Sequence, residues 1–196
     1  AKVLQNRSVE MAKKLNVNLV SRSSFTPEVE GTLITKEENI MEKPVVSGIA
    51  LDKNQVRVGM YGVTDRPGIA SAIFTALADA NINVDMIVQT VGVDGKTDLD
   101  FTIPRTDWEI CKGVMEKFKN ETENIDYNEK ICKVSIVGVG MKSHTGVASK
   151  AFTAMASENI NIRIISTSEI KISMIIEEKY AELAVRVLHD AYELDK

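Results

Sequence analysis

The loop TDRPG at residues 64–68 carries the first chemistry that could bind a small molecule. Alternating apolar residues before it are typical of a strand, and the alanine-rich run after it is typical of a helix. Pro67 fits a first helical turn, and Gly68 lets the backbone approach a ligand closely. Free N–H groups and the helix dipole at this terminus favour a carboxylate or a phosphate.

Asp65 adds the opposite preference, because its carboxylate is a partner for an ammonium group. A free amino acid carries both charges, so a carboxylate receptor beside a carboxylate donor suits it. A plainer interpretation stays open, in which Asp65 only caps the helix.

Motifs of common enzymes are incomplete. Gly138 and Gly140 follow a strand pattern, but Ser143 stands where a dinucleotide fingerprint needs its last glycine. His144 and His189 are the only histidines and fall in different elements, which argues against a metal site or a histidine-assisted nucleophile. We interpret the first as a turn residue and the second as a helix-face residue.

The remaining reactive side chains also have plain interpretations. Asp98 and Asp100 alternate with apolar residues as on a solvated strand face, which leaves paired-carboxylate catalysis a minor alternative. Cys111 and Cys132 lack CxxC spacing and are interpreted as small buried apolar residues. Four acidic residues indicate a solvated linker: Glu121, Glu123, Asp126 and Glu129.

Composition limits the function classes. The 196 residues are 44% hydrophobic and 27% charged, with a formal charge of -4. No apolar run suits a membrane span and no basic field attracts phosphate backbones, so neither a membrane nor a nucleic acid is an expected partner. Two separated cysteines without a preceding signal peptide indicate a reducing cytoplasm, and the start at Ala1 indicates a fragment or a processed product.

Residues 56–90 recur at residues 134–168, a period of 78 without a gap. Thirteen of the 35 aligned positions are identical, where unrelated segments would share about two. Each copy predicts the order strand, helix, strand, strand, helix. The first copy has these elements at 56–60, 69–81, 84–91, 99–103 and 108–118, with a hairpin turn at Asp94-Gly95 and a closing strand at 124–127. The second copy has them at 134–139, 147–156, 160–166, 169–176 and 181–192.

The second copy has no room for a closing strand before the chain ends at Lys196, whereas residues 45–51 predict a strand that the first copy does not need. We expect this strand to complete the second unit, so that the first unit is an insertion. The predicted domains are residues 56–130 and residues 45–55 plus 131–196, after a helix, a short strand at 19–22 and a tether within residues 1–44. The fold class is α+β, with two ferredoxin-like βαββαβ units whose antiparallel sheets carry helices on one face.

Four segments, TDRPG, NINVDMIVQT, GMKSHTGVASKAF and ISTSEIKIS, in this double βαββαβ order resemble the paired ACT domains in the regulatory region of aspartate kinase. Residues 1–14 and 22–35 resemble the end of the kinase domain and its link, although Gln5-Asn6 stands where His-Pro is usual. The resemblance implies feedback inhibition by L-threonine, L-lysine or both. The kinase motif KFGGTS is absent, so ATP and Mg²⁺ would belong to a kinase domain, and no cofactor or catalytic residue is expected in this chain.

The resemblance also implies the partners. These are a second copy through ACT–ACT pairing and the catalytic domain of aspartate kinase, or its α subunit. Some family members make the regulatory piece from an internal translation start as a separate β subunit, which joins α in an α2β2 complex.

The family places effector sites where an ACT unit of one chain meets one of another. Asp65 would bind the ammonium group, the backbone of residues 68–70 the carboxylate, and Gln89 the polar end of the effector. Asn161 and Ile162 of the partner chain would close the pocket, although Asn161 also suits a helix-ending turn. The strand start at residues 83–85 would border the pocket, with Ser168 nearby. The full implied set is Asp65, Gly68, Ile69, Ala70, Asn83, Val84, Asp85, Gln89, Asn161, Ile162 and Ser168.

The two copies are not expected to be equivalent sites, because the second has Ser143 for Asp65 and Thr145 for Pro67. The first copy would be the main receptor and the second mainly its wall. Two other classes stay open. One is an amino-acid-sensing ACT module of another enzyme or regulator, and the other is a small ferredoxin-like enzyme or RNA-binding protein, which the acidic charge and the lack of RNP aromatics disfavour.

Overall fold

The computed structural model describes residues 4–26, 28–35, 45–92, 94–138 and 146–195, and the chain forms two compact units, Ala1–Lys43 and Pro44–Lys196. In the first unit, α1 (Asn6–Leu15) ends at Asn16, whose φ of 56° is left-handed. Strand β1 (Leu19–Ser21) pairs antiparallel with β2 (Thr32–Ile34). The helix and β1 agree with the prediction, but part of the predicted tether is β2, which at three residues is too short to show a period.

The second unit is one six-stranded sheet in the order β4-β5-β3-β6-β8-β7, and every neighbouring pair is antiparallel. Its strands are β3 (Val46–Thr64), β4 (Ile87–Val91), β5 (Lys96–Ile103), β6 (Asn124–Gly138), β7 (Ile164–Thr167) and β8 (Lys171–Glu177). Its helices are α2 (Ile69–Asp79), α3 (Trp108–Met115), α4 (Val147–Ser157) and α5 (Ala181–Ala191), with 3-10 turns at Arg105–Asp107, Glu116–Glu121 and Glu178–Tyr180.

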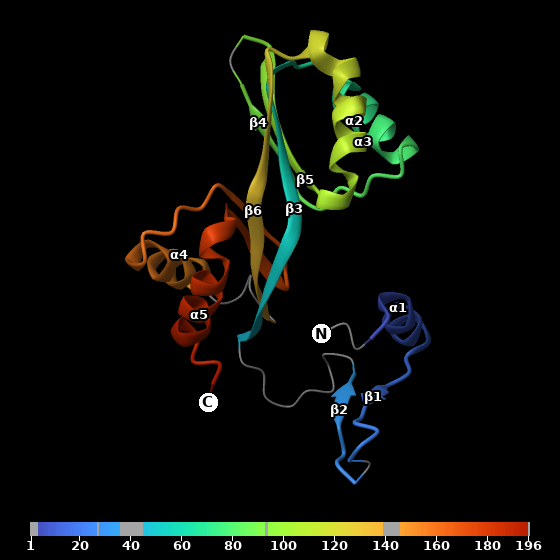
Figure 1. The fold of residues 1–196 in the computed structure, drawn as a ribbon, viewed down its shortest axis with the longest axis vertical. Helices are drawn as coiled ribbons and strands as arrows, with labels where there is room; N and C mark the ends of the chain where they lie inside the picture. Colours follow the sequence, from blue (N-terminus) through green and yellow to red (C-terminus); the bar gives the residue numbers. More distant parts are fainter. Residues whose placement is uncertain (1–3, 27, 36–44, 93, 139–145, 196) are drawn as a thin grey trace. The chain divides into compact units, whose positions relative to one another are not determined.

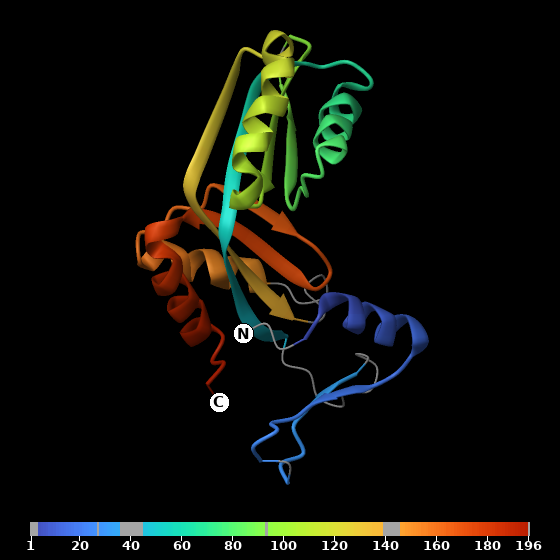
Figure 2. The same cartoon turned by 45° about the vertical axis from the view of Figure 1, so that its right-hand side comes forward.

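Two long strands connect the two repeats (Figure 2). Each joins two segments that the sequence predicted as separate strands. In β3 the two segments are separated by the polar run Asp52-Lys53-Asn54, which looks like a turn. It stays within the strand, and the pairing with β6 shifts register between Asp52 and Arg57. The first half of β3 pairs with the second half of β6, and the second half of β3 with the first half of β6. The segment 46–52 thus pairs with the first strand of the second repeat, which supports the predicted insertion. The domain boundaries stay a prediction. Part of the predicted linker is strand, since Asp126 and Glu129 lie within β6, and both residues are exposed, as predicted.

Each repeat has its own core under its own helix pair. Val58 and Phe101 belong to the first core, beneath α2 and α3, and Val134 belongs to the second, beneath α4 and α5. Tyr127 packs on the first core and Cys132 on the second. Figure 1 shows the two helix pairs on opposite faces of the shared sheet.

Several local predictions are confirmed and several boundaries move. Asp94 and Gly95 have φ values of 58° and 71°, as a tight hairpin turn requires. The free thiols of Cys111 and Cys132 are buried, as predicted. The strands predicted at 84–91 and 160–166 begin only at Ile87 and Ile164, and the helix predicted to 118 continues past Met115 as a 3-10 turn.

Candidate functional site

The loop at residues 64–68 connects β3 to α2 and is exposed from Thr64 to Gly68. Gly68 is the N-cap of α2 with a φ of 94°, a left-handed value that favours glycine, and no side chain of the described residues caps the helix. The interpretation of Asp65 as a cap is therefore wrong. Within the described residues its carboxylate forms no bond, while its N–H donates to the carbonyl oxygen of Gly95 at 2.8 Å. The carboxylate is available to a ligand.

The start of α2 offers backbone donors beside this carboxylate. The N–H of Ile69 is occupied, because it donates to the Arg66 carbonyl at 3.2 Å. The N–H of Ala70 donates to no acceptor in the part of the chain that the structure describes. Of the predicted 68–70 backbone, the Ala70 amide is thus better placed than the Ile69 amide to bind a carboxylate.

Gln89 lies on β4, the edge strand of the sheet, opposite Leu99. Its side chain is exposed in the single chain. Ile87 and Val91 on the same strand are 52% and 94% exposed. This edge therefore presents both apolar and polar side chains to solvent.

Residues 83–85 precede β4, with Asn83 exposed and Val84 packed on the first core. Asp85 is not a free border residue, because it forms an ion pair with Lys133 of β6. The sequence did not reveal this contact, since the two residues are 48 positions apart.

The second part of the predicted site lies between α4 and β8. Asn161 is exposed and Ile162 is half-buried against the second core. The interpretation of Asn161 as the helix-ending residue is wrong, because Asn159 has the left-handed φ of 55°. Ser168 forms the turn before β8, where its side-chain oxygen accepts from the Lys171 N–H at 3.2 Å.

The loop at 64–68 and the segment with Asn161 and Ile162 lie far apart in one chain, whereas Asp85 lies near the second of them through its ion pair with Lys133. The N–H of Arg163, which follows Ile162, donates to the carbonyl oxygen of Ile175 on β8. Ile175 lies opposite Lys133 of β6, which in turn lies opposite Asp52 of β3. The loop at 64–68 begins at the other end of β3, roughly 40 Å further along at 3.3 Å per residue. These two segments do not meet in one chain, so the family arrangement would require a second chain.

The face of the first repeat opposite its helices holds an arginine network that the sequence did not predict. Arg57 contacts Asp100 at 2.6 Å and Asp126 at 3.0 Å, and it also donates to the Tyr61 hydroxyl. Burial raises the pKa of Asp100, an effect that the nearby Arg57 opposes. Asp98 instead accepts from the Gly62 N–H at 2.9 Å. The solvated face predicted for Asp100 was therefore wrong, and both carboxylates have structural partners.

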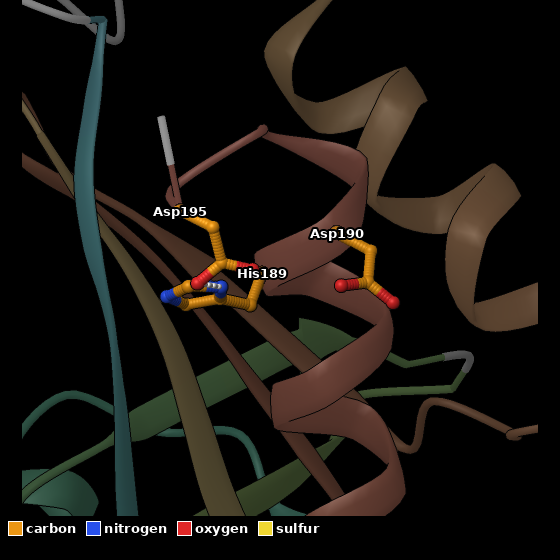
Figure 3. A group of neighbouring side chains, drawn as sticks. All are labelled: His189, Asp190 and Asp195. Atoms are coloured by element: carbon orange, nitrogen blue, oxygen red, sulfur yellow. Dashed lines mark ion pairs between the residues drawn. The ribbon is translucent and has the colours of Figure 1, made fainter.

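His189, Asp190 and Asp195 have potential metal-ligand atoms that all lie within 4.8 Å of one another. Figure 3 shows the Asp195 carboxylate beside the imidazole and the Asp190 carboxylate directed away from it. The two atoms His189 Nδ1 and Asp195 Oδ1 are 3.4 Å apart. Both aspartates are exposed, so the geometry is that of a surface ion pair formed when the imidazole is protonated. His189 lies on the face of α5, as predicted.

Three sequence predictions, those on Ser143, His144 and Thr145, lie outside the described residues. The proposed difference between the two copies thus stays a prediction. No helix in the described ranges is long and apolar enough to cross a membrane.

Two family models described as "ACT domain" match this chain, one at residues 56–120 and the other at residues 134–192. The chain is therefore a tandem ACT-domain protein. It is 65% identical over its whole length to an aspartokinase of Helicobacter pylori, and it spans only 49% of that relative.

Solved structures agree with this assignment. A structure of aspartokinase alpha and beta subunits is 52% identical, with a TM-score of 0.71, and the match covers 76% of this chain and 99% of that one. The ligand-free regulatory subunit of aspartate kinase from Thermus thermophilus is 40% identical, with a TM-score of 0.71, covering 75% and 98%. The chain belongs to the aspartokinase family and corresponds to its regulatory region.

Proposed function

We propose that this region binds L-threonine, L-lysine or both and thereby mediates feedback inhibition of aspartate kinase. The observation that carries the proposal is the exposed carboxylate of Asp65 beside the available N–H of Ala70, because an α-amino acid needs opposite partners for its two charges. Gln89 would bind the polar end of the effector from the neighbouring edge strand.

The proposal includes a homodimer formed by ACT–ACT pairing. The separation of the loop at 64–68 from Asn161 and Ile162 supports it, since the partner would supply the second part of each site. Strand β4 is an exposed edge on which a further strand can pair. An effector that binds only where the two chains complete the site would stabilise one quaternary arrangement. A coupling free energy of about 1 to 3 kcal/mol between effector binding and the kinase would shift the kinase toward its inhibited state.

The chain spans about half the length of the curated relatives it matches, so the catalytic activity belongs to the proposal as well. We infer that the partner is the catalytic domain of aspartate kinase, or an α subunit, which would hold ATP and Mg²⁺. The location is proposed to be the cytoplasm, where the two free cysteines would stay reduced.

The test is an activity assay of the aspartate kinase that contains this region, with threonine and lysine added separately and together. Asp65→Ala and Gln89→Ala should each raise the effector concentration for half inhibition, with activity in the absence of effector unchanged. Asp79→Ala is the matched control, since Asp79 is an exposed carboxylate at the other end of α2. Wild-type inhibition in folded Asp65→Ala and Gln89→Ala enzymes would remove both residues from the site.

A further inference from the structure

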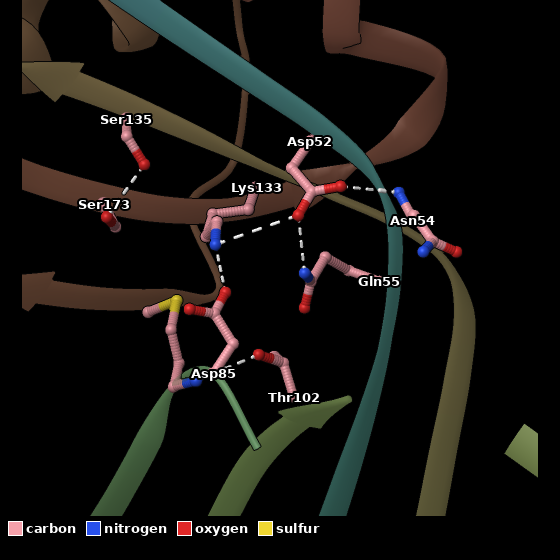
Figure 4. Close-up of polar contacts among 9 residues, drawn as sticks. Asp52, Asn54, Gln55, Asp85, Thr102, Lys133, Ser135 and Ser173 are labelled. Atoms are coloured by element: carbon pink, nitrogen blue, oxygen red, sulfur yellow. Dashed lines mark hydrogen bonds and ion pairs between the residues drawn. The ribbon is translucent and has the colours of Figure 1, made fainter. Parts of the chain in front are cut away.

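A small polar cluster joins the two ACT repeats (Figure 4). Its central residue is Lys133 on β6, whose side chain is only 14% exposed. The ammonium group forms an ion pair with Asp85, before β4, and lies 3.9 Å from Asp52 on β3. Gln55 donates to the same Asp52 carboxylate at 2.7 Å. Lys133 thus connects the segment that borders the predicted effector site to the strands of the second repeat.

Asp85 is held from its other side by the first repeat. Its N–H donates to the Thr102 carbonyl at 3.0 Å, and the N–H of Met86 donates to the Thr102 hydroxyl at 3.2 Å. The residue is therefore held between β5 of the first repeat and Lys133. A movement of the start of β4 would change the contact between Asp85 and Lys133.

An apolar cluster supports the same connection. Met86 and Val88, on either side of Ile87, pack with Ile131, Ile164 and Ile175 of the second repeat. Ile164 lies two residues after Ile162, which belongs to the other part of the predicted site. Within one chain, the start of β4, which would border that chain's own site, thus packs beside the segment that would close the site of the partner.

We propose that Lys133 is a positioning residue for effector binding: by holding Asp85 it keeps the start of β4 in place and makes the two ACT repeats respond to effector as one body. This inference rests on the proposed function. The ammonium group of Lys133 contacts the carboxylates of both Asp52 and Asp85. An uncharged side chain at residue 133 would remove this positive charge from both carboxylates. Both carboxylates keep solvent contact, at 41% and 32% exposure, so this loss need not unfold the protein.

The test compares Lys133→Met, Lys133→Arg and Lys130→Met in the full chain. Lys130 is the control, an exposed lysine on the same strand. Calorimetric titration with L-threonine and L-lysine should show roughly 3- to 10-fold weaker binding for Lys133→Met, the size typical of residues that transmit coupling. Lys133→Arg should restore most of the affinity, and Lys130→Met should bind like the wild type.

Two further readouts separate positioning from a loss of folding. Amide exchange of the peptide covering residues 82–92 should be faster in Lys133→Met than in Lys133→Arg. In a double-mutant cycle with Asp85→Asn, the combined variant should bind no more weakly than the weaker single variant, because both changes remove one contact.

Additive losses, or exchange and affinity in Lys133→Met equal to those of Lys130→Met, would overturn the proposal. If wild-type protein binds neither amino acid, the proposed function fails. The exchange comparison then still decides whether Lys133 holds the start of β4.

Discussion

Cutting one side chain from the second core should destabilise the first repeat as well, because β3 and β6 run through both. The change is Leu188→Ala on α5, where Leu188 is fully buried among the residues of the second core. Truncating a buried leucine costs about 2 to 5 kcal/mol, through lost apolar burial and the cavity left behind. The loss should be shared by both repeats, since neither can unfold without breaking the bonds between β3 and β6.

The single tryptophan makes this measurable. Trp108 lies in the first core, 9% exposed, with its ring 4.6 Å from that of Tyr127. Its fluorescence reports the first repeat, while far-UV circular dichroism reports all helices and strands. At a urea dependence of about 2 kcal/mol per molar, a loss of about 3 kcal/mol lowers the unfolding midpoint by about 1.5 M.

Both signals should move together by this amount in Leu188→Ala. The control is Ile170→Ala, which removes a side chain that is 54% exposed and should change the free energy of unfolding by no more than about 0.5 kcal/mol. If circular dichroism shifts in Leu188→Ala while Trp108 fluorescence keeps its wild-type midpoint, the two repeats fold independently and the shared-sheet reasoning is refuted.

Three other outcomes are expected. Asp65→Ala should keep the wild-type urea midpoint, as its exposed carboxylate has no bond within the described residues, yet weaken effector binding about 10- to 100-fold in titration, the effect of losing a charged hydrogen bond. Burial raises the pKa of Cys111 to about 12 and of Cys132 to about 11, from an ordinary 9.0. A thiol reagent at pH 8 should therefore label them only in urea. Both thiols have a higher pKa in the folded protein than in the unfolded chain. Their contribution to folding stability is therefore complete below pH 9 and is lost as the pH rises through 11 to 12. The double variant Cys111→Ala/Cys132→Ala should accordingly show a shallower loss of stability above about pH 9. Gly92→Ala should destabilise by about 1 to 3 kcal/mol in urea unfolding, because the new Cβ would lie 2.3 Å from the Lys96 carbonyl oxygen; a wild-type midpoint would contradict it.

The sequence predicted the elements whose periods are visible over several turns. Helix α2 buries Ile69, Ile73 and Leu77 at the predicted spacing, and the 78-residue offset located α4 equally well. The continuity of β3 was not predictable, because Asp52, Lys53 and Asn54 resemble a turn and only the pairing with β6 keeps them in the strand.

The candidate site was predictable only in its local part. The chemistry of Asp65 and Gly68 follows from neighbouring residues, so the sequence could locate the loop. Arg57 gave no local signal, because an arginine on an alternating strand usually faces solvent. The pairing of Lys133 with Asp85 depends on strand order and twist, which no short stretch of sequence encodes.

The most direct test of the central claim is calorimetric titration of the wild-type chain with L-threonine and with L-lysine, with oligomeric state followed by light scattering. A dimer should bind at least one of them saturably, and Asp65→Ala should weaken this binding about 10- to 100-fold. A folded dimer that binds neither amino acid, or an Asp65→Ala chain that binds as tightly as the wild type, would contradict it.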